Sequence, residues 1–359
     1  MPTSLARPTI AAGDAPPPRR ITSNHVNPGT LSHAATRPTD SAIVGRQPMK
    51  YIFGPVNSRR LGASLGIDLL PRKICSFDCI YCEIGTTTEL TAQRREYVPT
   101  SDICREIEQF LATPGADDQV DIFTVTASGE PTLHSGLGEI IGHLKRQSPK
   151  PVAVLTNGSL VHLPEVRREL ALADLLVPSL DAALETSFRK VNRPAKEIAL
   201  DQMIEGLAAL RREAKGRFHL EILLVRGINH SPADIAALNR AIGLIKPDLV
   251  QLNTVARPPA EPFAKALSRV ELEEIARCLP GPVEIIAAPP HGRATPDRPA
   301  MAEEILAMLM RRPCTTADIC LALNIEPAPA AALLRNLETA GRVRRTNHNN
   351  EEYYKVINE

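Results

Sequence analysis

The residues with the clearest potential for chemistry are three cysteines in the segment CSFDCIYC, residues 75–82. Their spacing, C-x3-C-x2-C, places three thiols on one short loop. Three thiolates can hold three corners of a [4Fe–4S] cubane, whereas a complete protein-ligated site takes four cysteines. The next cysteine is Cys104, outside the loop, so one iron would remain open to an external ligand, as in catalytic metal sites. The spacing alone also allows a three-cysteine zinc site or a redox Cys-x-x-Cys pair.

Strand and helix patterns alternate between residues 62 and 287, and these elements must position the loop. Short apolar runs predict strands at 64–70, 120–126, 151–156, 174–179, 219–225, 248–254 and 283–286. Helical periods lie between them at 101–111, 137–146, 163–172, 198–214, 232–245 and 269–278. This alternation predicts an α/β fold with right-handed βαβ units and a parallel sheet. Six such units favour a partial (β/α)6 TIM-like barrel with its chemistry at the carboxyl ends of the strands. An open doubly wound sheet is the alternative.

The chain divides by composition into four parts. Residues 1–48 lack a sustained apolar period and contain Pro16-Pro17-Pro18, which predicts a disordered tail. Residues 49–287 form the expected partial barrel, and 288–299 read as a Pro-rich linker. In residues 300–359, helical patterns at 302–310, 316–323 and 327–340 precede strand patterns at 341–346 and 351–357. Three helices and a hairpin predict a small winged-helix-like domain.

Charge and cysteine content narrow the class of protein. The 359 residues hold 42 Lys+Arg and 41 Asp+Glu, a net charge of +1. This balance argues against a surface built as a whole to bind nucleic acid or anionic lipid. No uninterrupted apolar stretch reaches about 18 residues, so we expect no transmembrane helix and no membrane partner. Seven cysteines in a long chain, with no secretory signal pattern, favour a reducing, cytoplasmic setting.

The cysteine loop, with Tyr81 before its last cysteine, resembles the radical S-adenosylmethionine (SAM) superfamily over residues 51–287. Residues 53–62 (FGPVNSRRLG), 66–68 and 82–85 resemble a poorly characterised subgroup that is often grouped with the tRNA wyosine synthases, although Asn57 stands where that subgroup has proline. The resemblance implies that Cys75, Cys79 and Cys82 ligate a [4Fe–4S] cluster whose open iron is chelated by SAM. Reductive cleavage of SAM would then yield a 5′-deoxyadenosyl radical, with an external low-potential electron donor as partner.

The same resemblance implies further cofactor-binding residues near the cysteine loop. Gly129 and Glu130 lie in a Ser-Gly-Glu-Pro segment after the second predicted strand, where backbone and carboxylate would receive the methionyl ammonium. Asn157 ends the third strand, and Tyr81 would shield the cluster and line the adenine pocket. The structural alternatives are a solvated loop carboxylate for Glu130, an Asn-Gly turn for Asn157 and aromatic packing for Tyr81.

Three more residues complete the predicted SAM site. Ser179 and Asp181 end the fourth predicted strand in a Ser-x-Asp pattern that the superfamily shares. We assign Ser179 to polar atoms of SAM and Asp181 to a supporting or substrate role, with helix capping as the alternative for Asp181. Arg193 is a candidate partner for a carboxylate or phosphate, because its planar fork suits bidentate recognition, or else it is a surface arginine.

The sequence does not name the substrate. A winged helix suggests nucleic acid, and Arg342, Arg344 and Arg345 of its hairpin are candidate phosphate contacts, so tRNA or another nucleic acid is one candidate substrate and a small metabolite the other. For the module itself we favour protein interaction or packing over nucleic-acid contact. No cysteine precedes Cys75, so we predict no second cluster of the archaeal wyosine synthase type. The alternative function is a non-catalytic iron–sulfur or zinc sensor that binds DNA through the winged helix. A sensor would not need six βα units, so we favour the enzyme.

Overall fold

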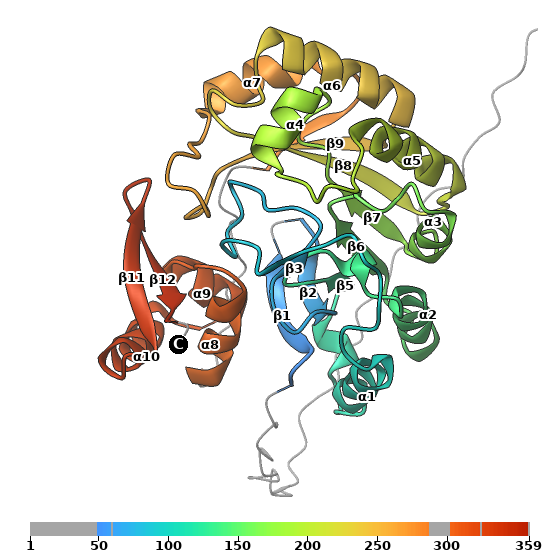
Figure 1. Ribbon diagram of the computed structural model, residues 1–359. Coiled ribbons are helices and arrows are strands. Elements are labelled where there is room, and N and C mark those ends of the chain that lie inside the picture. Colours follow the sequence, from blue (N-terminus) through green and yellow to red (C-terminus); the bar gives the residue numbers. More distant parts are fainter. Residues whose placement is uncertain (1–48, 59, 287–301, 324, 358–359) are drawn as a thin grey trace, which may run out of the picture. The chain divides into compact units, whose positions relative to one another are not determined.

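The computed structural model of the chain describes residues 49–58, 60–286, 302–323 and 325–357. Within these residues one large sheet is accompanied by helices, and a smaller group of helices and strands follows at the C-terminal end (Figure 1). The predicted disordered tail at 1–48 and the predicted linker at 288–299 lie outside the described residues.

The large sheet has eight strands in the order β1-β2-β5-β6-β7-β8-β9-β10. Its strands are β1 (Ile52–Ser58), β2 (Gly62–Asp68), β5 (Ile122–Thr126), β6 (Val152–Thr156), β7 (Leu175–Pro178), β8 (Arg217–Leu224), β9 (Leu249–Thr254) and β10 (Val283–Ile285). Strand β1 pairs antiparallel with β2, and every other neighbouring pair is parallel. The α/β class and the mostly parallel sheet are confirmed, and all seven predicted strands are present with shifted ends. Strand β1 was not predicted.

Helices connect the parallel strands, and Figure 1 shows them following one another in an arc outside the sheet. They are α1 (Thr100–Leu111), α2 (Leu137–Gln147), α3 (Pro164–Leu170), α5 (Leu200–Glu213), α6 (Pro232–Ile245) and α7 (Arg269–Cys278). Helix α6 begins at a capping box in which Ser231 and Asp234 satisfy each other's backbone N–H groups. One further helix, α4 (Glu185–Val191), lies between β7 and α5 and was not predicted.

The main hydrophobic core lies between the sheet and these helices. Leu65 and Ile67 of β2 are fully buried, as are Ile140 and Ile141 of α2. Burying such an aliphatic side chain contributes about 1.5–3 kcal/mol, so the alternation of apolar runs that predicted the strands also accounts for their stability. This core fixes the sheet whose strand ends carry the predicted site.

The C-terminal elements have a hydrophobic cluster of their own. They are α8 (Ala302–Arg311), α9 (Thr316–Leu323), α10 (Pro327–Thr339), β11 (Val343–His348) and β12 (Glu351–Val356). The two strands form an antiparallel hairpin whose turn residues Asn349 and Asn350 have positive φ angles of 51° and 64°, a conformation that asparagine tolerates. The predicted order of three helices and two strands is therefore found. We call these residues, 302–357, the C-terminal module.

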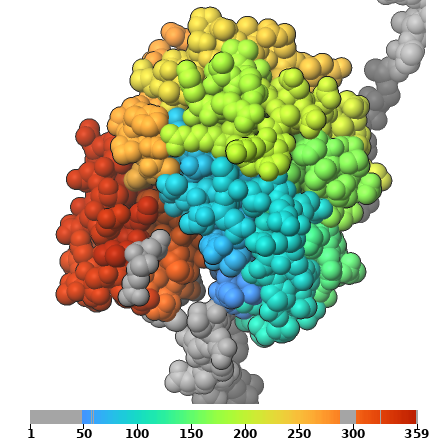
Figure 2. All heavy atoms as spheres, viewed as in Figure 1, coloured from blue at the N-terminus to red at the C-terminus, as the bar shows by residue number. Residues whose placement is uncertain are grey.

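The C-terminal module contacts the sheet and the loops at its edge. Arg257, just past β9, forms ion pairs with Asp318 of α9 and with Glu83. The Tyr353 hydroxyl donates to the carbonyl of Ala256 at 3.0 Å. In the space-filling view the module (red) adjoins the segment after β9 (orange), in agreement with these bonds (Figure 2).

No single helix among the described residues has the length and apolar character to cross a membrane; helices α9 and α10 meet that test only when taken together, with a bend of 118° between them.

Candidate functional site

The cysteine loop follows β2 and is closed by a small two-stranded sheet. Strand β3 (Ile74–Cys75) pairs in parallel with β4 (Glu89–Leu90). Within the loop, Asp78 accepts a hydrogen bond from the Thr87 backbone at 2.7 Å. These contacts give the three cysteines a folded loop instead of an extended segment.

The three thiols are free and are at least partly shielded from solvent. Cys75 is buried, and Cys79 and Cys82 are half-buried. Burial raises the pKa of Cys75 to about 12 and that of Cys79 well above its ordinary value. Bare thiolates would therefore be costly here, whereas a bound metal deprotonates a coordinating thiol outright.

The segment at 191–195, which begins with the last residue of α4, holds the cysteine loop through backbone hydrogen bonds. The backbone N–H groups of Asp78 and Ile80, which flank Cys79, donate to the carbonyls of Asn192 and Val191 at 3.0 Å each. The backbone N–H of Ala195 donates to Ser76 at 2.8 Å. We call residues 191–195 the cradle segment. It orients the loop from a part of the chain more than a hundred residues away.

Asn192 in the cradle segment reaches a cysteine sulfur directly. Its side-chain Nδ2 donates to Cys79 Sγ at 3.4 Å and to Asp181 Oδ2 at 2.7 Å. Asn192 is 2% exposed, and its Oδ1 has no partner among the described residues. The two acceptors fix the amide orientation, since the opposite orientation would place oxygen against both of them. The neighbouring Arg193 was predicted as a binding residue, whereas Asn192 was not.

Asp181 joins the cysteine loop to two strand ends. Its Oδ2 also accepts from the Tyr81 hydroxyl at 2.5 Å, and its Oδ1 accepts from the backbone of Leu223 in β8 at 2.8 Å. Burial raises the pKa of Asp181 to about 6 despite these donors. The structure thus brings together Tyr81 and Asp181, which were predicted separately from different parts of the sequence.

Gly129 packs against the backbone that leads into the first cysteine. A Cβ atom at this position would lie 1.7 Å from the carbonyl oxygen of Ile74, a separation that no side chain can occupy. The next residue, Glu130, donates its backbone N–H to the same oxygen at 3.1 Å. Glycine at 129 is therefore required for the end of β5 to meet β3.

The Glu130 carboxylate is bound by the protein's own donors. Its Oε1 accepts from the Thr132 backbone, the Thr132 hydroxyl and the Thr156 hydroxyl at 3.0, 2.5 and 2.6 Å. Its Oε2 accepts from the Asn157 backbone at 2.6 Å. A carboxylate offers about four acceptor sites, and the protein already supplies four donors. We therefore expect a methionyl ammonium to bind backbone carbonyls of this segment more readily than the carboxylate. The role of Glu130 toward SAM stays a prediction.

Asn157 lies beside the cysteine loop. Its Nδ2 donates to Ser76 Oγ at 2.9 Å and is 3.6 Å from Cys75 Sγ. Two asparagines, one after β6 and one after α4, therefore direct N–H groups at two of the three sulfurs. Hydrogen bonds to sulfur are one means by which proteins tune iron–sulfur clusters.

Two predicted residues are tied to other parts of the protein. Arg193 donates from Nη1 to Glu261 Oε1 at 2.5 Å, so a cofactor carboxylate would have to compete with this ion pair. Ser179 forms a parallel bridge with Glu221 and donates its backbone N–H to Thr156 at 2.9 Å. Their roles toward SAM stay predictions.

A cavity of about 440 Å³ lies beside the cysteine loop. Tyr81, Cys82 and Glu83 contribute from the loop, and inward-facing residues of β2, β5, β8 and β9 contribute from the sheet. Helices α8 and α9 supply another part of the wall. The size falls within the range of small-molecule sites, and a reactant bound here would be adjacent to Cys82, the last cysteine of the loop.

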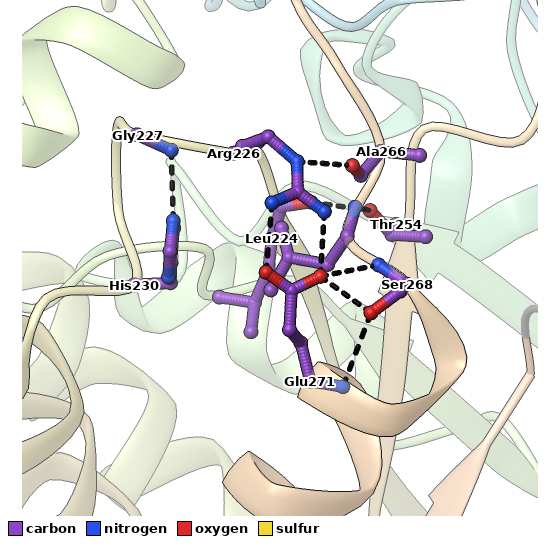
Figure 3. Close-up of polar contacts among 9 residues, drawn as sticks. Leu224, Arg226, Gly227, His230, Thr254, Ala266, Ser268 and Glu271 are labelled. Atoms are coloured by element: carbon purple, nitrogen blue, oxygen red, sulfur yellow. Dashed lines mark hydrogen bonds and ion pairs between the residues drawn. The ribbon is translucent and has the colours of Figure 1, made fainter.

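The ends of β8 and β9, at one side of this cavity, are joined by a network of hydrogen bonds (Figure 3). Thr254 Oγ1 donates to the carbonyl of Leu224 at 2.7 Å, which ties the end of β9 to the end of β8. Beyond them, Arg226 makes two hydrogen bonds to Glu271, at 2.7 and 2.5 Å. Ser268 completes the capping box of α7 with Glu271. The hydrogen bonds from Arg226 and Ser268 lower the pKa of Glu271 to about 2.

The donor set fits an iron–sulfur cluster. Three buried or half-buried cysteines lie on one loop, and amide donors point at two of their sulfurs. No three histidine, cysteine, aspartate or glutamate side chains of the described residues converge on one metal-ion position. A cubane presents its irons at separate corners, so its cysteines need not meet at a point.

Residues 69–238 match the Radical SAM superfamily. A UPF0026 protein of Synechocystis is 39% identical over 211 residues, which are 58% of this chain and 76% of that protein. A protein named GTPase Obg from Brachyspira hyodysenteriae is 36% identical over 298 residues, 82% of this chain but 43% of that protein, so the chain spans less than half the length of this relative. Among solved structures, a radical SAM methyltransferase from Sphaerobacter thermophilus aligns with a TM-score of 0.46 and 19% identity over 62% of this chain and 66% of that one.

Proposed function

This chain belongs to the UPF0026 family and carries a radical SAM superfamily domain, and on that premise we propose that Cys75, Cys79 and Cys82 ligate the [4Fe–4S] cluster of a radical SAM enzyme. A [4Fe–4S] cluster and SAM are the cofactors of this superfamily, and its enzymes need a reductant. When bound, they supply a 5′-deoxyadenosyl radical by one-electron cleavage of SAM. The observation that carries the proposal is the docking of all three cysteines on one loop held by the cradle segment.

The chain's own residues would hold the cofactors in place. Asn192 and Asn157 donate hydrogen bonds toward the sulfurs, and the Tyr81–Asp181 bond keeps the last turn of the loop against β8. The backbone at Gly129 would receive the methionyl ammonium, since the neighbouring carboxylate is filled by protein donors. Ser179 would contact polar atoms of SAM.

The cavity beside the cysteine loop would receive the substrate. Its walls combine the sheet with α8 and α9, and enclosure of this kind limits water and oxygen at a reactive radical. We propose that the sheet with its helices is a partial (β/α)6 barrel and that the C-terminal module is a winged-helix domain placed beside it. A cytoplasmic location, with an external low-potential electron donor, fits the cysteine chemistry.

Nucleic acid, tRNA included, is a less favoured substrate than a small molecule. Two arginines of the hairpin are already paired: Arg342 with Glu303 and Arg345 with Glu338 and Glu352. Phosphate contacts would have to displace these pairs. We propose that the chain is related to the subgroup grouped with the wyosine synthases, without assigning it their substrate.

Anaerobic reconstitution followed by addition of dithionite and SAM tests the enzyme function. We expect 5′-deoxyadenosine to be released and iron content to fall in Cys75→Ala, Cys79→Ala and Cys82→Ala. Cys104→Ala is the matched control, because Cys104 lies in α1 outside the loop, and it should keep its iron. A single zinc ion in anaerobically purified protein would refute the cluster. An intact cluster that never cleaves SAM would favour the iron–sulfur sensor.

A further inference from the structure

Four arginines line the cavity, and they differ in how their charges are compensated. Arg60 donates from Nη1 to Glu221 at 2.6 Å and to Gln251 at 3.0 Å. Arg257 pairs with two carboxylates, as described above. The remaining two, Arg311 and Arg312, stand at the end of α8.

Arg311 is a largely buried cation without a close carboxylate. Its side chain is 17% exposed, and its ion pair with Asp68 spans 3.8 Å. Its Nε has no hydrogen-bond partner among the described residues, while Nη1 donates to the carbonyl of Ala307. The guanidinium lies over the ring of Phe53, 4.0 Å from its centroid. Arg312 forms no ion pair within the described part of the chain.

Asp68 does not neutralise these two arginines by a direct bond. Its Oδ1 accepts from the backbones of Leu70 and Ser128, and its Oδ2 accepts from the Ser128 hydroxyl. The carboxylate is therefore engaged in shaping the end of β2. The carboxylate that Arg311 faces at 3.8 Å is thus already bonded to other groups, and Arg312 has no ion-pair partner among the described residues.

The pKa shifts of these arginines agree with the difference in their ion pairing. Burial lowers the pKa of Arg311 below its ordinary value. For Arg60 and Arg257 burial also acts to lower the pKa, but their paired carboxylates outweigh it and the net shift is upward. A buried charge without a close partner is costly.

We propose that Arg311, with Arg312 beside it, binds an oxyanion of the substrate, a carboxylate or a phosphate, in the cavity next to the cysteine loop. This inference rests on the proposed function, because only an enzyme of that kind would bind a substrate in this cavity. A guanidinium with unused donors is suited to oxyanions. The cavity of about 440 Å³ fits a small anionic molecule, and the C-terminal module thereby supplies the recognition residue.

The test is calorimetric titration of the reconstituted full-length protein with inorganic phosphate and, separately, with succinate. The two arms distinguish a phosphate from a carboxylate site. We expect one of them to bind and Arg311→Met to weaken that binding about tenfold or more, as for loss of a hydrogen bond to a charged group. Arg212→Met is the matched control, because Arg212 is an exposed residue of α5, and the affinity of that variant should be unchanged.

Several outcomes overturn the inference. These are the absence of binding by either anion, equal losses in both variants, or binding of a short RNA oligonucleotide that depends on Arg311 while neither small anion binds. Arg311→Lys keeps the charge without the planar fork and should retain part of the affinity. If both Arg311 variants unfold, modification of wild-type Arg311 by phenylglyoxal gives the answer, because the bound anion should protect it and lack of protection refutes the site. Iron content is measured in parallel, so a protein that binds the anion without a cluster refutes the proposed function and not this inference.

Discussion

Replacement of Asn192 by leucine should make the cluster harder to reduce. The substitution keeps the approximate size of the side chain and removes the N–H group that lies 3.4 Å from Cys79 Sγ. A reduced cluster carries one more negative charge than the oxidised one, so its sulfur accepts a hydrogen bond more strongly. Loss of the donor therefore disfavours the reduced state.

The magnitude follows from the value of one hydrogen bond. A differential of about 1 kcal/mol is typical of a single hydrogen bond. For a one-electron couple, about 59 mV corresponds to a tenfold change in the ratio of reduced to oxidised protein. One such bond therefore predicts a midpoint lower by about 40 mV. The variant also leaves Asp181 without its Asn192 donor, which should lower the free energy of unfolding by about 1.5–3 kcal/mol.

The assay is a redox titration of the reconstituted cluster followed by electron paramagnetic resonance. Asn229→Leu is the matched control: Asn229 is fully buried and donates to the carbonyls of Asp181 and Leu223, but not to a sulfur. It should lower stability and leave the midpoint unchanged.

An Asn192→Leu protein with full iron content and a wild-type midpoint would refute the reasoning. Equal midpoint shifts in both variants would instead assign the effect to loosened packing. If neither variant binds iron, the test uses wild-type protein labelled with 15N-asparagine. A reduced cluster that shows no magnetic coupling to an asparagine nitrogen would refute the hydrogen bond to sulfur.

Two further predictions concern the supports of the site. Gly129→Ala should lower iron content and thermal stability together, because its Cβ would lie 1.7 Å from the Ile74 carbonyl oxygen; iron content equal to wild type would show that β3 shifts freely. Arg226→Met should raise the pKa of Glu271 from about 2 toward its ordinary value of 4.5, as measured by NMR titration. Because the folded pKa is depressed, the stabilisation by Arg226 is fully present above pH 4.5 and is lost as the pH falls toward 2, so the stability difference between the two proteins should narrow over that interval.

The sequence predicted the cysteine loop and the alternation of strands and helices because both are local patterns. Thiol spacing needs only eight consecutive residues, and the apolar runs of the parallel strands are nearly continuous. Strand β1 was missed because Gly54-Pro55 interrupts it and its pairing with β2 is irregular between Phe53 and Val56. Helix α4 was missed because it has seven residues and, unlike the equally short and uncapped α3, no proline in its first turn to mark its start.

The partners of the cysteines were harder to predict, because they depend on distant contacts. Asn192 lies 113 residues from Cys79, and nothing in its local sequence separates it from an ordinary helix-ending asparagine. Arg311 looks like a basic residue at the end of an amphipathic helix, and its position in the cavity emerges only when α8 packs beside the sheet. A buried polar side chain next to a predicted ligand residue is recognisable only in three dimensions.

The cradle segment also sets the order of events during biosynthesis. A ribosome that has released only the cysteine loop has exposed three thiols but not residues 191–195, whose backbone groups orient that loop. Iron delivered at that moment would meet an unshaped peptide. We therefore expect assembly machinery to act on a chain that has grown past Ala195, which is more than half of the 359 residues.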